Sequence, residues 1–260
     1  MKLKKLIILA TILMISATVF GQKPEPKADA KTSEAKPTPA AKLPAAKEIL
    51  DKYVQALGGR EAYEKIRTRT TKGTVELAPM GVKGTVEVYQ SAPDKSYSKL
   101  TLNGIGDIIE AYDGKTAWTI NPLQGNRDKT GEELLQTKLL STFHRETNFE
   151  KLYTKMEVKG VEKVGDKEVY VISATPPGLE PQTFYFDKQT GLLVREDSTA
   201  VSPEGKMPVK SFYEDYREVD GIKMPHKLRT VLPQFEITMM FTEIKNSSKI
   251  DENIFSKPKE

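Results

Sequence analysis

Hydrophobic and polar residues alternate through most of the chain beyond residue 67. Because neighbouring side chains of a strand point to opposite faces, this period of two predicts β-strands, for example at 84–89, 183–187 and 235–244. Turn residues recur between these segments about every ten residues, and Asp113-Gly114 and Asp220-Gly221 are typical of hairpins. We therefore predict a mainly β protein with an antiparallel sheet of about eleven strands.

A helical period appears in two places. Residues 45–57 carry apolar side chains on one side and end at Gly58-Gly59, and a short second helix is expected at 60–66. Residues 132–145 interrupt the strands, with Thr130 as N-cap. Their helical spacing is carried by Leu134, Leu135, Leu139, Leu140 and Phe143.

The predicted strands each have one apolar face that needs a cover. The pairs are Val86/Val88, Val169/Val171, Phe184/Phe186 and Met239/Phe241. Two helices of three to four turns cover so many strands only if the sheet curls around them, so we expect a curved, incompletely closed antiparallel β-barrel with helices over its concave face. The space between is then either filled by the helices or left as a cavity for an acyl chain or another apolar ligand.

The expected lining of that cavity comes from the strands and from the inserted helix. The candidates are Val86, Val88, Trp118, Leu135, Leu139, Phe143, Phe184, Phe186, Met239 and Phe241.

The N-terminus predicts export. Lys2, Lys4 and Lys5 precede an apolar run at 6–17, which is typical of a secretory signal peptide and too short for a membrane span. We assign 1–21 to the signal peptide, 22–44 to a disordered Pro/Ala/Lys-rich linker and 45–260 to the folded domain. The mature protein is expected in the periplasm, with no membrane span after cleavage.

Composition narrows the function. The chain has no cysteine, which excludes thiol nucleophiles, thiolate metal sites and lipidation at an N-terminal cysteine. The net charge of +4 arises largely before residue 44, where three lysines lie in the signal peptide and the linker has five lysines against three acids. The domain itself is close to neutral with interspersed charges, so we expect no nucleic-acid partner.

No catalytic motif emerges. The two histidines, His144 and His226, have no metal-ligand spacing, and Ser96 and Lys99 match S-x-x-K only formally, within a predicted strand. A hydrolase would require Ser96, His144 or His226 to converge with an acid in one pocket. We expect no enzymatic activity, no metal and no cofactor.

Several segments occur together in one known group of proteins. They are 48–59 followed by Ile66-Arg67-Thr68, Tyr112-Asp-Gly-Lys-Thr-Ala-Trp118, the hairpins at 186–193 and 216–225, and the closing segment 250–258. In their order and spacing they resemble the outer-membrane lipoprotein-sorting superfamily, the LolA/LolB-like proteins, over residues 45–258. The resemblance implies an open barrel with a helical lid and an apolar cavity for lipoprotein acyl chains. It also implies an internal arginine that holds the lid, a role that we assign to none of Arg67, Arg69, Arg127 and Arg145.

Two functional hypotheses follow. The first is a soluble, exported, monomeric protein that binds a lipid, such as a lipoprotein acyl chain, beneath a helical lid, for transport within the cell envelope. The second is a non-enzymatic envelope scaffold with a fully packed core, which meets a protein partner through an exposed edge strand or its linker. A cavity of roughly 300 Å³ or more would favour the first hypothesis.

Overall fold

The computed structural model describes residues 42–258. The predicted signal peptide and nearly all of the predicted linker lie outside the described residues. Thirteen described strands form a single antiparallel sheet, two more than the approximate prediction. They are β1 (Thr68–Ala78), β2 (Val82–Ser91), β3 (Lys95–Leu102), β4 (Gly106–Tyr112), β5 (Ala117–Ile120), β6 (Arg127–Lys129), β7 (Lys155–Val164), β8 (Lys167–Thr175), β9 (Gln182–Asp187), β10 (Leu193–Ser202), β11 (Gly205–Val219), β12 (Ile222–Val231) and β13 (Glu236–Asn246).

The sheet is open, as predicted. Its order is β6-β5-β4-β3-β2-β1-β13-β12-β11-β10-β9-β8-β7, so β6 and β7 are the two edge strands, each paired on one side only. The first and last strands, β1 and β13, pair in the middle, and the remaining neighbours are consecutive hairpins. The described helices are α2 (Ala46–Ala56), α3 (Arg60–Lys65), α4 (Gly131–Ser141) and α5 (Phe149–Leu152), with 3₁₀ turns η2 (Arg145–Thr147) and η3 (Glu252–Phe255).

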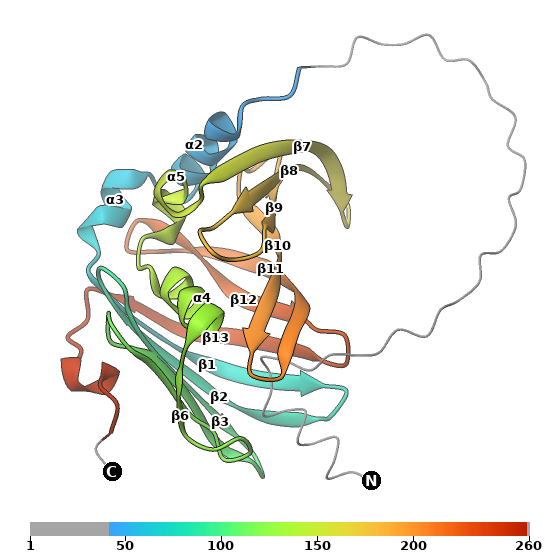
Figure 1. The fold of residues 1–260 in the computed structure, drawn as a ribbon. Coiled ribbons are helices and arrows are strands. Elements are labelled where there is room, and N and C mark those ends of the chain that lie inside the picture. Colours follow the sequence, from blue (N-terminus) through green and yellow to red (C-terminus); the bar gives the residue numbers. More distant parts are fainter. Residues whose placement is uncertain (1–41, 259–260) are drawn as a thin grey trace, which may run out of the picture.

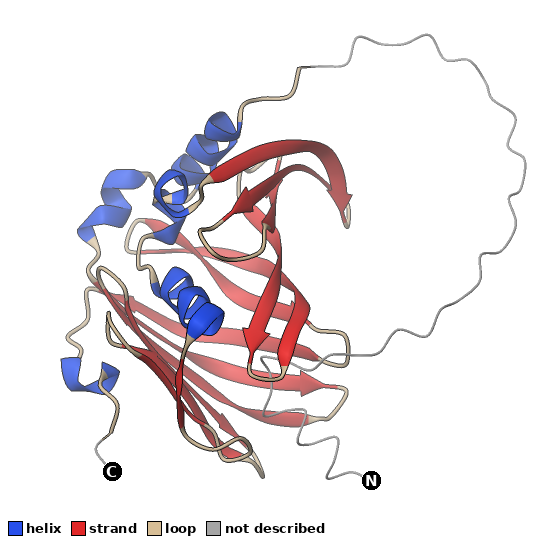
Figure 2. Cartoon of the chain, viewed as in Figure 1, coloured by secondary structure: helices blue, strands red, loops and turns tan. Residues whose placement is uncertain are grey.

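The sheet curls around its helices. Figure 1 shows α4 on the concave side, between the half that contains β1–β3 and the half that contains β10 and β11, with α2, α3 and α5 gathered at one end. Figure 2 shows how few helices there are for the extent of sheet. The segment from 131 to 152 connects the edge strand β6 with the opposite edge strand β7, and therefore crosses the open side of the barrel.

Strand β13 bulges at Thr242, opposite Lys72 and Gly73 of β1, near the middle of the sheet. Gly73 pairs with Val86 on one side and Phe241 on the other. A Cβ at Gly73 would lie 2.1 Å from the Met240 carbonyl oxygen, so only glycine allows the two strands to approach this closely.

Helix α2 packs with its apolar side inward, as its pattern predicts. Ile49, Leu50, Tyr53 and Val54 are buried, and the Tyr53 ring lies 5.1 Å from the Phe186 ring. The helix ends where the backbone turns through two positive φ angles at Gly58-Gly59. This end docks on the β11–β12 hairpin, because the Lys223 amide donates to the Leu57 carbonyl at 2.8 Å.

Strands β8 and β9 are buried on both faces, which corrects one prediction. Phe184 pairs with Ile172 on the face that meets α2 and α5, whereas Val171 pairs with Tyr185 on the opposite face. Val169, Val171, Tyr185 and Val194 form a separate small core there. The pair Val169/Val171 therefore does not share a face with Phe184/Phe186.

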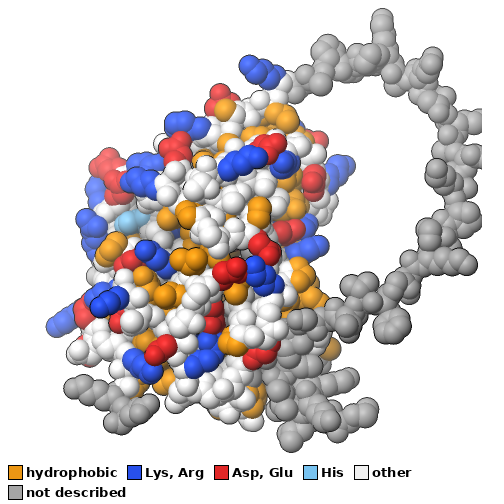
Figure 3. Space-filling view, in the orientation of Figure 1, with side chains coloured by type: hydrophobic (Ala, Val, Ile, Leu, Met, Phe, Trp, Pro, Cys, Tyr) orange, Lys and Arg blue, Asp and Glu red, His pale blue; other side chains and the backbone are white. Residues whose placement is uncertain are grey.

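The two edge strands are poor templates for further pairing. β6 has only three residues. β7 is bulged between Val158 and Gly160 and carries lysines at 155, 159 and 163. Elsewhere the visible surface mixes acidic and basic side chains with hydrophobic ones between them (Figure 3), in agreement with the interspersed charges of the sequence.

Candidate functional site

Three adjacent cavities lie against the concave face of the sheet, and the segment that contains α4 lines two of them. Their volumes are about 310, 210 and 200 Å³, and Val88 of β2 lines all three. The largest is enclosed by β1, β2, β11–β13, the end of α2 and the connection from α4 to α5. The cavities share wall residues and are therefore neighbours along the concave face, and we refer to the three together as the hollow.

Five of the predicted lining residues line this hollow. Val88, Phe143 and Phe241 line the largest cavity, and Val86 and Met239 line the 200 Å³ cavity with Val88. These side chains come from β2, β13 and the residues just after α4, so strand pairing through β1 brings them together.

The other five predicted lining residues lie elsewhere. Leu139, Phe184 and Phe186 are buried in the core that α2 and α5 cover. Trp118 is also buried, and its indole Nε1 donates to the Phe255 carbonyl at 3.0 Å. Leu135 is 43% exposed on α4. None of the five lines one of the three cavities.

Helix α4 is shorter than predicted, and two of the leucines predicted to lie on its apolar face are exposed. It ends at Ser141, and the expected helical stretch to residue 145 is replaced by a turn, η2 and α5. Thr130 occupies the N-cap position, but its side chain makes no capping bond. Leu135 and Leu140 are exposed, although Leu140, at 50%, also lines two of the cavities.

Polar contacts attach α4 to the barrel. Its buried Glu133 accepts two hydrogen bonds from Arg127 at 2.7 and 2.8 Å. Its buried Gln136 bonds the backbone of β10 twice, donating to the Thr199 carbonyl at 2.6 Å and accepting from the Val201 amide at 3.0 Å. The helix therefore covers the cavities through hydrogen bonds to the sheet.

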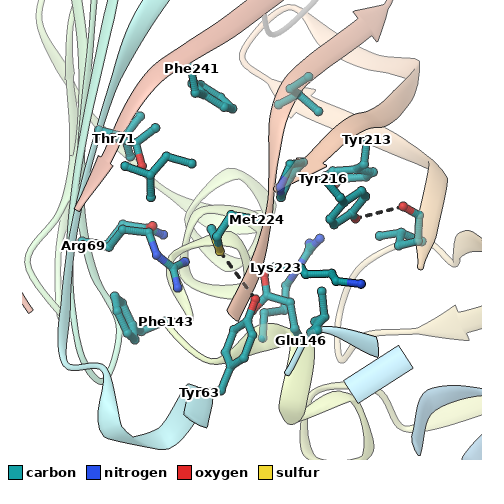
Figure 4. A pocket seen from close by; sticks show the side chains of 18 of the residues that line it. Tyr63, Arg69, Thr71, Phe143, Glu146, Tyr213, Tyr216, Lys223, Met224 and Phe241 are labelled. Carbon is teal, nitrogen blue, oxygen red and sulfur yellow. Dashed lines mark hydrogen bonds between the residues drawn. The ribbon is translucent and has the colours of Figure 1, made fainter. Parts of the chain in front are cut away.

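The 310 Å³ cavity has a charged end, and Arg69 is its most buried cation. Arg69 projects inward from β1 (Figure 4) and is only 4% exposed. Its Nε donates to Asn246 Oδ1 at 3.0 Å, and its guanidinium carbon lies 5.2 Å from the centre of the Phe143 ring. Its Nη2 is buried and has no hydrogen-bond partner within residues 42–258.

A second arginine lines the same cavity from the segment after α4. Arg145 Nη2 pairs with Glu196 Oε2 of β10 at 2.7 Å, and the Tyr213 hydroxyl donates to the same oxygen at 2.9 Å. Burial raises the pKa of Tyr213 well above its usual value, and Glu196 adds to this, so the hydroxyl stays protonated. Arg145 Nη1 is buried without a partner in the described chain.

Glu146 adds an acceptor to this end. It lines the same cavity, and its Oε2 is buried without a hydrogen-bond partner among the described residues. Tyr63 lies beside it (Figure 4) and donates to Met224 Sδ at 3.7 Å. Burial, with a smaller contribution from Glu146, raises the pKa of Tyr63 far above its usual value, so the Tyr63 hydroxyl stays protonated and neutral.

From the sequence, Arg69 and Arg145 are candidates without an assigned role, and Glu146 and Tyr213 are not recognised as site residues. A signal for Arg69 was available, because it has the same strand parity as Thr71, Gly73 and Val75 and so lies on the face that carries Val75 inward. An arginine on the apolar face of a strand is unusual. Arg145 and Glu146 follow α4 in a turn, where no periodicity indicates which side is buried.

The candidate catalytic residues have other partners. The Ser96 hydroxyl bonds the Ser141 hydroxyl at 2.6 Å, and His226 Nδ1 lies 3.0 Å from the Met224 carbonyl. The His144 ring packs against Phe143 and Tyr63. Within residues 42–258 no three His, Asp or Glu side chains are grouped to hold a metal ion, and no helix has the length and apolar character to cross a membrane.

No family model and no curated protein matches the chain. Solved structures do share its fold. A LolA superfamily protein from Nitrosomonas europaea matches 83% of this chain and 99% of its own, with 14% identity and a TM-score of 0.55. A DUF1329 family protein from Desulfovibrio piger matches 81% and 96%, with 14% identity and a TM-score of 0.55. An outer membrane lipoprotein-sorting domain from Vibrio parahaemolyticus matches 80% and 94%, with 13% identity and a TM-score of 0.51. The predicted resemblance is confirmed as a LolA-like fold.

Proposed function

We propose that this protein, which has the LolA-like fold, binds the acyl chain of a lipid in the hollow between its sheet and α4. The observation that carries the proposal is the cavity of about 310 Å³, which continues into the 200 Å³ cavity between Val86, Leu100, Ile108 and Met239. Ligand sites of proteins are concave, mainly apolar and of this size or larger. A lipoprotein acyl chain is one such ligand.

The cavity volume favours binding over the alternative of a fully packed envelope scaffold. The alternative requires an exposed edge strand or the linker to meet its partner; of the edge strands, β6 is very short and β7 is bulged. Export to the periplasm and transport of the ligand within the envelope belong to the same proposal. Cell fractionation tests the location.

We further propose that the ligand is bound and released without chemical change. Supporting this, Ser96, His144 and His226 have no acidic hydrogen-bond partner within the described chain. Mass spectrometry of a ligand recovered after prolonged incubation with the protein tests whether it is released unchanged. A hydrolysed product would contradict this proposal.

Titration of the delipidated protein with a fluorescent apolar probe tests the binding proposal. We expect saturable binding that fatty-acyl lipids displace. Val88→Trp should fill the space where the cavities meet and reduce binding at least about tenfold, because the acyl chain loses its apolar contacts. Val161→Trp, at an exposed position on β7, is the matched control and should bind like the wild type.

Circular dichroism must show that both variants are folded. The proposal fails if the wild type shows no saturable binding and no lipid is found by mass spectrometry in the protein as isolated from cells.

A further inference from the structure

The 210 Å³ cavity of the hollow is lined mainly by polar residues. It lies between α4 on one side and the strands β2, β3, β4 and β6 on the other. Apart from Val88, Ala111 and Leu140, every residue that lines it has a polar or charged side chain. An acyl chain placed here would leave these groups without hydrogen bonds, which is unfavourable. We refer to this part of the hollow as the polar cavity.

The charged side chains of the polar cavity are paired within the protein. Lys129 is only 4% exposed, and its Nζ lies 3.1 Å from Glu110 Oε1. Glu133 accepts two hydrogen bonds from Arg127. Among the described residues no other charged side chain lines this cavity, so the two pairs leave it without net charge. A charged ligand group would remain uncompensated here, and the cavity therefore favours a neutral one.

Other polar side chains of this cavity remain available to a ligand. The Gln90 amide on β2 and the Ser98 hydroxyl on β3 make no side-chain hydrogen bond within residues 42–258. The hydroxyls of Ser96 and Ser141 lie 2.6 Å apart, so one donates to the other and the second keeps its proton for a ligand. Amides and hydroxyls both donate and accept hydrogen bonds. A ligand group that matches this wall must do the same.

The rest of the wall is made of carbon. Val88 lies beside Ser98 in the strand pairing, and Leu140, at 50% exposed, faces the cavity from α4. A sugar ring combines hydroxyl groups around its rim with C–H groups on its two faces, and so matches both kinds of surface. The volume of about 210 Å³ equals that of about seven water molecules at about 30 Å³ each, which admits a group of the size of one sugar ring.

We propose that the polar cavity binds a neutral polyhydroxylated group, that of a sugar. The ring packs between Val88 and Leu140, and its hydroxyls exchange hydrogen bonds with Gln90, Ser98 and Ser141. The sugar is either the head group of a glycolipid, with its alkyl chain in the neighbouring cavities, or a free sugar. This goes beyond the proposed function, because it adds carbohydrate recognition to the binding of an acyl chain.

Two ligands with the same alkyl chain test the proposal, with the protein as isolated from cells and then delipidated. Octyl glucoside should displace the apolar probe at a concentration at least about tenfold lower than octyl methyl ether, because the ether has no hydroxyl to donate. Equal displacement by the two ligands, or tighter binding of the ether, overturns the proposal.

NMR titration with methyl glucoside, which has no alkyl chain, distinguishes the two sources of the sugar. If the free sugar is the ligand, methyl glucoside shifts the amide resonances of Gln90, Ser98 and Ser141. If the sugar of a glycolipid is the ligand, only octyl glucoside shifts them. The proposal fails if neither compound shifts these resonances.

Two variants test the residues. Gln90→Met and Ser98→Ala break no side-chain hydrogen bond within the described chain, so both should fold, which circular dichroism checks. Each should weaken octyl glucoside binding about threefold to tenfold and change the binding of octyl methyl ether by less than about twofold. Gln189→Met, on the exposed turn after β9, and Thr85→Ala, on the opposite face of β2, are the matched controls.

Both controls should keep the wild-type preference for octyl glucoside over octyl methyl ether. The same preference in both Gln90→Met and Ser98→Ala overturns the proposal. Probe binding without any preference for the glucoside refutes this inference alone. Sugar-induced shifts without saturable probe binding would instead refute the proposed function and leave this inference standing.

Discussion

Helices α2 and α4 both cover the inner side of the curled sheet, but apolar side chains dominate the contacts of α2 and polar side chains those of α4. α2 buries Ile49, Leu50, Tyr53 and Val54 in the main core. α4 contributes only Leu139 to that core, and it buries Glu133 and Gln136, which bond Arg127 and the backbone of β10, while Leu135 and Leu140 remain exposed. α2 is held mainly by the hydrophobic effect, whereas α4 is held by one buried leucine and a few polar contacts.

This difference assigns the two helices different mechanical roles. Full burial of a large apolar side chain contributes about 1.5–3 kcal/mol, whereas a typical hydrogen bond contributes about 0.5–1.5 kcal/mol net. α2 is therefore a fixed wall of the domain. α4 can separate from the sheet at a smaller cost in free energy, which suits a cover over a binding hollow.

The largest expected effect comes from the fixed wall. Leu50→Ala should lower the free energy of unfolding by about 2–5 kcal/mol, because Leu50 is buried in the main core and its truncation leaves a cavity. Chemical denaturation measures this. A loss below about 1 kcal/mol would contradict the view that apolar packing holds α2.

A smaller effect is expected from the cover. Gln136→Ala removes both bonds to β10 and should lower the global stability by about 1–3 kcal/mol. It should also accelerate amide hydrogen exchange in residues 131–147 more than in α2. Leu135→Ala, one residue away and exposed, should change stability by less than about 0.5 kcal/mol. Equal exchange in α4 and α2 of the Gln136 variant would remove the distinction between the helices.

The smallest effect concerns the turn that follows α4. Burial lowers the pKa of His144, opposed by Glu146 and Glu64 and assisted by Arg69 and Arg67. The folded state therefore binds a proton at His144 less readily than the unfolded state does. The stability that neutral His144 contributes to the folded state is fully present above the ordinary histidine pKa of about 6.5, and it is lost as the pH falls through the lower folded-state pKa.

Thermal unfolding from about pH 8 to about pH 5.5 measures this dependence, and His144→Phe should show a shallower fall than the wild type. At the upper end of that range the two proteins differ only by packing, which provides the internal control. An equally steep fall in the variant would assign the acid sensitivity to other groups.

The contrast between the helices also explains what the sequence could predict. α2 and most strands can be predicted from the sequence, because their hydrophobic pattern matches the side chains that are buried. The leucines of α4 follow the same pattern, yet Glu133 and Gln136 are buried because Arg127 and β10 lie beside them, which no local pattern contains. Alternation likewise shows that Val169 and Val171 share a face, but only strand pairing shows that Phe184 lies on the other one.

The hollow was predictable in outline and its charged end was not. Val86, Val88, Met239 and Phe241 follow from alternation in two strands. Arg69 becomes meaningful only when the curl of the sheet places Arg145 and Glu146, from a segment some 75 residues later in the chain, at the same cavity.

An open barrel carries a risk that a closed one avoids, because strand ladders tend to continue from one molecule into the next. Here the three-residue β6 offers few free backbone groups, while the bulge and the lysines of β7 interrupt its ladder and repel a second copy. The fold can thus leave its concave side open and still resist polymerisation through its edges.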